Sequence, residues 1–78
     1  MIRIDGHNRT ARDAADEFAR TAFEEPRKVG VFRNREHGHH NHYADFQLID
    51  GARWYEVWLL WDYSGWNIAE TEEPAAVV

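Results

Sequence analysis

The stretch HNHYADFQLIDGARWYEVWLLWDY, residues 40–63, decides the fold of this 78-residue chain. Apolar and polar side chains alternate on both sides of the dipeptide Asp50-Gly51. Successive side chains of a strand point to opposite faces, and Asp-Gly favours a tight primed turn in which glycine supplies the positive φ. The stretch therefore predicts a β-hairpin with strands at residues 40–49 and 52–63.

This hairpin has one register, which sorts its side chains onto two faces. The pairs expected on the first face are Leu48 with Arg53, Phe46 with Tyr55, Ala44 with Val57, and His42 with Leu59. The pairs expected on the second face are Gln47 with Trp54, Asp45 with Glu56, Tyr43 with Trp58, and Asn41 with Leu60. The first face is nearly all apolar. Because a small sheet needs only one buried face, we look for function on the second.

A strand and a helix are expected before the hairpin. Residues 2–5 alternate isoleucine with charged residues, which predicts a short strand ending at Gly6. Thr10 is a suitable N-cap with Asp13 three residues later, and Pro26 ends the helical pattern. The apolar stripe of this helix comprises Ala11, Ala14, Ala15, Phe18, Ala22 and Phe23. Such a stripe predicts a helix that lies close on a sheet.

Residues 28–33 are predicted to form a further strand of the sheet. A loop at residues 36–39 would return the chain into the hairpin and place Val31 opposite Ala44. Valine would then join the apolar face that the Asp-Gly hairpin defines independently. This agreement favours a meander of neighbouring antiparallel strands.

A turn at residues 64–65 would add a short last strand by pairing Trp61 with Ile68. The predicted fold is a two-layer α+β sandwich, in which a strand and a helix precede an antiparallel meander of three to four strands and the helix covers one face. Residues 1–70 would form the single domain, and residues 71–78 a flexible C-terminal tail. The expected core contains Ile2, Ile4, Ala15, Phe18, Ala22, Val29, Val31, Ala44, Phe46, Leu48, Tyr55, Val57, Leu59 and Trp61.

Composition narrows the class of partner. Fourteen Asp and Glu against nine Lys and Arg give a net charge of −5, which argues against direct nucleic-acid binding and favours a protein with a basic surface. Mild acidity that only keeps the protein soluble is the alternative. The absence of cysteine, of a signal-like apolar start and of any apolar run near 20 residues predicts a cytoplasmic protein without membrane contact. No cofactor is implied.

Two kinds of side chain are candidates for partner binding. Aromatic residues expected on the second face are Phe32, Tyr43, Trp54 and Trp58, and acids expected on the outer side of the helix are Asp13, Asp16, Glu17 and Glu24. Asp45 opposite Glu56 on the second face would cost several tenths of a kcal/mol, which a basic partner residue would relieve. Aromatic rings on an open sheet anchor partners well. Three interpretations stay open: partner binding, burial in a homodimer, and packing of the rings on one another.

Neither metal binding nor catalysis has a strong signal. The metal-like cluster is His37, His39, His40 and His42, and it lacks a second ligand pair at a fixed spacing. Ser64 is the only serine, there is no cysteine, and a shallow sheet face gives Asp45 and Glu56 no enclosed site for acid-base chemistry. We therefore expect a non-enzymatic protein without catalytic residues.

The chain resembles the small phage-encoded anti-CRISPR proteins. The resemblance covers the whole-chain layout of one helix on an aromatic antiparallel sheet, the acidity and the small size, and it includes no diagnostic motif. It implies stoichiometric binding to a subunit of a CRISPR effector complex, often of type I, in a bacterial host cell. The inhibitor would then prevent target DNA from binding or the nuclease from being recruited. The alternatives are a homodimeric structural or adaptor domain and, on the histidine cluster, a metal-binding protein.

Overall fold

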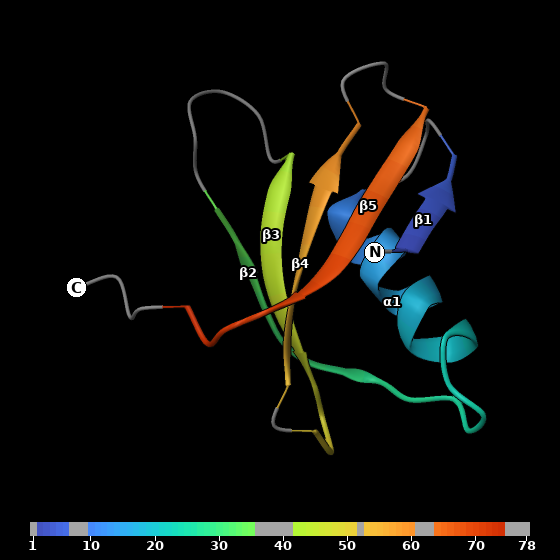
Figure 1. The fold of residues 1–78 in the computed structure, drawn as a ribbon, viewed down its shortest axis with the longest axis vertical. Helices are drawn as coiled ribbons and strands as arrows, with labels where there is room; N and C mark the ends of the chain where they lie inside the picture. The colour runs from blue at the N-terminus through green and yellow to red at the C-terminus, as the bar shows by residue number, and fades with distance from the viewer. Residues whose placement is uncertain (1, 7–9, 36–41, 52, 61–63, 75–78) are drawn as a thin grey trace.

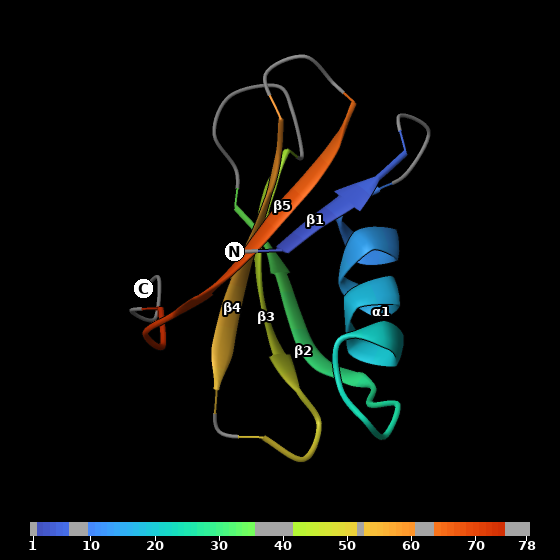
Figure 2. The ribbon, with the colours of Figure 1, turned by 45° about the vertical axis from the view of Figure 1, so that its right-hand side comes forward.

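The part of the protein that the structure describes is an α+β arrangement of one helix and one antiparallel sheet. The computed structural model describes residues 2–6, 10–35, 42–51, 53–60 and 64–74. In chain order the elements are β1 (Ile2–Asp5), α1 (Ala11–Thr21), β2 (Val29–Asn34), β3 (Tyr43–Leu48), β4 (Trp54–Leu59) and β5 (Gly65–Thr71). The sheet order is β1-β5-β4-β3-β2, and α1 lies against one face (Figures 1 and 2). The sheet has five strands rather than three to four, because β1 pairs with β5 beside the meander.

The central hairpin has the predicted register with a different turn. Asp45 is opposite Glu56, and the neighbouring pairs of β3 and β4 follow the expected ladder. The predicted primed turn is wrong, because Gly51 does not adopt a positive φ. Instead, the Gly51 N–H donates to the Leu48 C=O at 3.2 Å, and the next strand begins at Trp54. Lengthening the connection equally on both sides leaves the pairing unchanged.

The pairing of β2 with β3 differs from the prediction. Val31 is opposite Gln47 rather than Ala44, and Phe32 is opposite Phe46. The register shifts between Val29 and Val31, so one extra residue enters β2 there. Such a bulge exchanges the two faces for all residues beyond it, which turns Phe32 toward the helix and Val31 away from it. The expected loop at residues 36–39 lies outside the described residues.

β5 also pairs in an unexpected register. Ile68 is opposite Val57 and Trp66 is opposite Leu59, whereas the predicted partner Trp61 lies outside the described residues. The turn expected at residues 64–65 is wrong, because Gly65 already belongs to β5. The observed register differs from the predicted one by an even number of residues, so Trp66 and Ile68 still face the helix.

The start of α1 follows from its sequence. The Thr10 side chain accepts a hydrogen bond from the Asp13 N–H, and the Asp13 carboxylate accepts one from the Thr10 N–H, each at 3.1 Å. This capping box satisfies backbone donors that the first turn leaves unpaired.

The described part of the chain contains no helix long and apolar enough to span a membrane.

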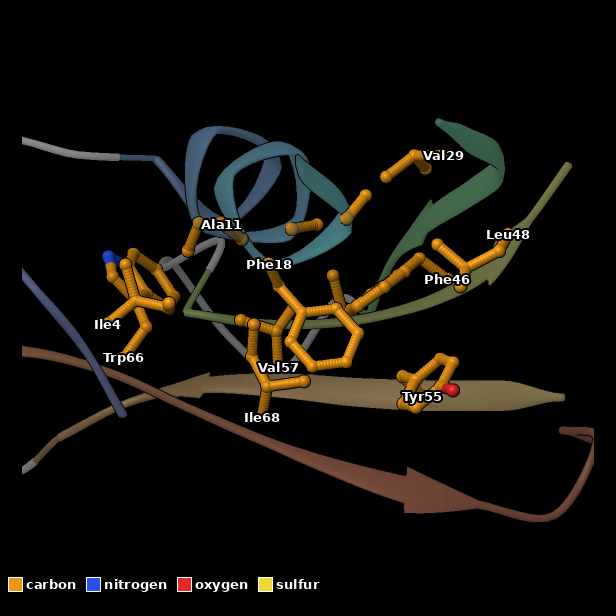
Figure 3. Close-up of a cluster of buried hydrophobic side chains, with 14 residues drawn as sticks. Ile4, Ala11, Phe18, Val29, Phe46, Leu48, Tyr55, Val57, Trp66 and Ile68 are labelled. Atoms are coloured by element: carbon orange, nitrogen blue, oxygen red, sulfur yellow. The ribbon is translucent and has the colours of Figure 1, made fainter. Parts of the chain in front are cut away.

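The core lies between α1 and the sheet, with Phe18 at its centre (Figure 3). The Phe18 ring centroid is 5.0 Å from that of Tyr55 and 5.8 Å from that of Phe46. Small side chains let the helix approach the sheet, and the fully or almost fully buried alanines of α1 are Ala11, Ala14, Ala15 and Ala19. The predicted core residues Ile2, Val31 and Ala22 are exposed instead. Ile2 is at the edge strand, Val31 follows the bulge, and Ala22 follows the end of the helix.

Candidate functional site

The face of the sheet turned away from α1, which we call the outer face, is the candidate site. The helix packs on the opposite face alone, as the two layers in Figure 2 show. Side chains of the outer face that make described contacts with one another are Arg33, Arg35, Tyr43, Asp45, Trp54, Glu56 and Trp58. They come from three neighbouring strands, β2, β3 and β4, and from the residue that follows β2.

A partly buried ion pair lies at the centre of the outer face. Asp45 is 3% exposed, and Arg35 holds its carboxylate through two hydrogen bonds, Nε to Oδ2 at 2.6 Å and Nη2 to Oδ1 at 3.0 Å. The hydrogen bond to Asp45 is the main cause of a raised Arg35 pKa. The chain therefore supplies its own cation beside Asp45 and Glu56, where we expected a partner to supply one.

Tyr43 connects this ion pair to Glu56 and to Trp58. The guanidinium carbon of Arg35 lies 4.5 Å from the centre of the Tyr43 ring, and the Tyr43 hydroxyl donates to Oε2 of Glu56. On the adjacent strand, the Trp58 ring stacks on the Tyr43 ring at 22° with centroids 6.4 Å apart. Burial first, and then the hydrogen bond to Glu56, raise the pKa of Tyr43 to about 12. These contacts hold the Tyr43–Trp58 stack in one orientation.

Two aromatic residues of the predicted binding set are not available on the outer face. Trp54 is on this face but is only 5% exposed, and the guanidinium of Arg33 lies over its ring at 5.3 Å. Phe32 is on the helix side, packed against the core and beneath the guanidinium of Arg12. The expectation that Phe32 lies on the second face is wrong because of the bulge in β2. Part of the predicted aromatic binding set is therefore explained by rings that pack against residues of the same chain.

The acids predicted for partner binding divide between two surfaces. Glu56 and Asp45 are on the outer face, whereas Asp13, Asp16, Glu17 and Glu24 belong to α1 and the segment after it, across the sheet. Asp13 is used in the helix cap, and Asp16 accepts a hydrogen bond from Nε of Arg12 at 3.2 Å. One flat partner surface cannot contact both groups.

The histidine cluster is largely outside the described part of the chain. His37, His39 and His40 lie outside it, and His42 is a half-buried residue whose backbone C=O accepts from the Leu59 N–H. No group of three potential metal ligands occurs among the residues that the structure describes.

Sequence reasoning missed the two arginines that organise the outer face. Arg33 and Arg35 are two apart, so they share one face of an extended strand, and Asp45 lies on the next strand. This two-residue spacing of the arginines was a signal that could have indicated the cluster on the outer face. The predicted register between the two strands would have placed Arg33 opposite residue 42 instead of Asp45, which hid the pairing.

Comparison of the chain with protein-family models, with curated proteins and with solved structures found no match. We base the functional proposal on the geometry of the outer face and on the charge of the chain.

Proposed function

We propose that this chain is a non-enzymatic binding protein that contacts a protein partner through its outer face. The observation that carries the proposal is the Tyr43–Trp58 stack on a sheet face that α1 does not cover. Tyrosine and tryptophan dominate the binding energy of protein interfaces because they offer large areas with few rotatable bonds. The Arg35 contact to Tyr43 already restricts that ring, so binding loses less side-chain entropy.

The partner that fits best has a basic surface that ordinarily binds nucleic acid. The net charge of −5 attracts such a surface, and the half-buried Glu56 carboxylate lies beside the stacked rings where it can meet a cation. A groove that holds phosphates by charge can also be occupied by carboxylates. The resemblance to anti-CRISPR proteins makes this concrete as inhibition of a type I CRISPR effector complex by blocking its target DNA.

An electrophoretic mobility shift assay tests the proposal with a purified type I effector complex and its target duplex. We expect the wild-type protein to reduce the fraction of DNA bound, and the variant Glu56→Gln/Trp58→Ala to need at least about 10-fold more protein, since a hot-spot residue contributes roughly 2 kcal/mol or more. The matched control is Ile49→Ala/Glu72→Gln, which removes one carboxylate and an isoleucine that is 69% exposed. Inhibition should survive in the control. Equal inhibition by both variants would contradict the role of the outer face.

The same face could instead join two copies of the chain. In that case static light scattering at low micromolar concentration would give twice the 9.2 kDa mass of the monomer, and Trp58→Ala would restore the monomer mass. A monomeric wild type would exclude this second function for the outer face.

A further inference from the structure

A basic hollow lies on the other side of the molecule, between α1 and the segment that leads into β2. Its volume is about 490 Å³. Among the residues that the structure describes, four cations line it, Arg12, Arg20, Arg27 and Lys28, and Asp16 is the one carboxylate that does so. Nearly half of the nine Lys and Arg residues of an acidic chain therefore surround one small space. We call this space the basic hollow.

The fold brings these cations together from two elements. Arg12, Asp16 and Arg20 follow one another at four-residue steps, which places them along the same side of α1. The backbone N–H of Arg27 donates to the C=O of Ala19 at 2.8 Å. This bond holds the start of the segment against the last turns of α1, so that its side chains form the opposite wall.

Two of the four cations are held in place by contacts within the chain. Arg12 bonds to Asp16, and its guanidinium carbon lies 5.4 Å from the centre of the Phe32 ring. Arg27 donates through Nη1 to Oδ2 of Asp50 at 2.7 Å. Fixed guanidinium groups lose little freedom when a ligand binds, which favours affinity.

The other two cations have spare charge and donors. Within the described ranges of the chain, neither Arg20 nor Lys28 has an ion-pair partner. The buried Nε of Arg27 also has no hydrogen-bond partner there. A buried donor with no acceptor is unusual in a folded protein. Arg20 and Lys28 are exposed, so water satisfies their donors, and an anion bound in the basic hollow would take the place of that water.

We propose that the basic hollow binds the phosphate group of a small phosphorylated molecule. Guanidinium groups match the geometry of phosphate oxygens, and a dianion suits a site where cations outnumber carboxylates. Pro26, Val29 and the methylene stems of the arginines provide apolar walls for the rest of the ligand. The volume lies within the roughly 300–1,000 Å³ typical of small-molecule sites. This site is separate from the outer face and from the protein-binding function proposed for it.

Isothermal titration calorimetry tests the proposal with pyrophosphate, adenosine monophosphate and adenosine as probes, in low salt without divalent metal. We expect saturable binding of both phosphorylated probes and none of adenosine. The variant Arg20→Gln/Lys28→Gln should weaken binding at least about 10-fold, because it removes the two cations without internal partners. The matched control Arg3→Gln/Arg53→Gln has the same net charge, and its two arginines are exposed and do not line the basic hollow. It should bind within about 2-fold of the wild type.

The relative affinities of the two phosphorylated probes show which part of a ligand the basic hollow recognises. Equal affinity for both phosphorylated probes would support recognition of the phosphate group alone, and tighter binding of the nucleotide would support a ligand that also uses the apolar walls. No saturable binding of either probe, or the same loss in both double variants, would overturn the proposal. Binding of a single-stranded DNA oligonucleotide without binding of the small probes would also overturn it. Circular dichroism checks that both variants fold.

Discussion

Replacing Arg35 by methionine should destabilise the protein far more than the loss of an ordinary surface ion pair. The substitution removes the guanidinium and keeps most of the apolar stem over Tyr43. The Asp45 carboxylate, on a side chain that is 4% exposed, is then left without its cation. Breaking a fully buried pair costs about 3–5 kcal/mol. Because the Arg35 side chain is 37% exposed and water can reach that end of the pair, we expect about 2–3 kcal/mol. A domain of this size has roughly 4–12 kcal/mol in total.

Urea unfolding of a double-mutant cycle with Asp45→Asn measures this effect. In the wild-type background the asparagine should destabilise the protein, because its amide can accept only one of the two Arg35 hydrogen bonds and carries no charge to pair with the guanidinium. In the Arg35→Met background the same Asp45→Asn substitution should stabilise the protein, because it removes a buried charge that has lost its cation. Arg3→Met is the matched control, since Arg3 pairs with Asp5 at 2.8 Å with both side chains exposed, and it should cost no more than about 1 kcal/mol. A loss at Arg35 as small as this control, or an asparagine effect of the same sign in both backgrounds, would refute the reasoning.

Two further predictions concern the sheet. Gly65→Ala should cost about 1–3 kcal/mol in thermal or urea unfolding, because its Cβ would lie 2.4 Å from the backbone oxygen of Ile4. The control Gly51→Ala has no described heavy atom nearer than 3.7 Å to the new Cβ, so it should change stability by less than about 0.5 kcal/mol. Similar losses in both variants would count against the close approach of β1 to β5. Tyr43 should make the stability of the protein sensitive to alkaline pH, because its pKa of about 12 in the folded protein lies above the unfolded value near 10. Its contribution to the free energy of unfolding is therefore complete below about pH 10 and is lost as the pH rises from there through 12. Urea unfolding across this range should show a steeper decline for the wild type than for Tyr43→Phe, and parallel curves would contradict the raised pKa.

The parts of the fold that could be predicted are those with a local physical cause. The alternation around Asp50-Gly51 predicts the pairing of Asp45 with Glu56 correctly even though the turn type is wrong, because register depends on side-chain period and on the symmetry of the connection. The Thr10 cap and the alanine stripe likewise predict the start and the buried side of α1, which ends at Thr21 rather than continuing through Phe23 toward Pro26.

The bulge in β2 and the distribution of charge over the surface could not be predicted, because no local sequence pattern indicates them. A bulge between Val29 and Val31 adds one residue without changing composition, yet it exchanges the faces of Phe32 and Arg33. The candidate site changed with it, from an open aromatic surface to a stack supported by Arg35 and Asp45. The acidity of the whole chain also concealed the basic hollow, because net charge says nothing about how charges are distributed in space.

The pairing of β1 with β5 has a consequence for how the chain acquires its structure during synthesis. Ile4 is opposite Trp66, so the first strand has no strand to pair with until about 60 further residues have been made. At about 5–20 residues per second, a ribosome needs roughly 3–12 s to produce that partner. The meander and the helix can assemble through shorter connections in the meantime, while β1 waits as an unpaired segment. Closure of the sheet at this edge should therefore be the last step of folding, and a slow-translating stretch late in the message would prolong the exposure of β1 to chaperones and proteases.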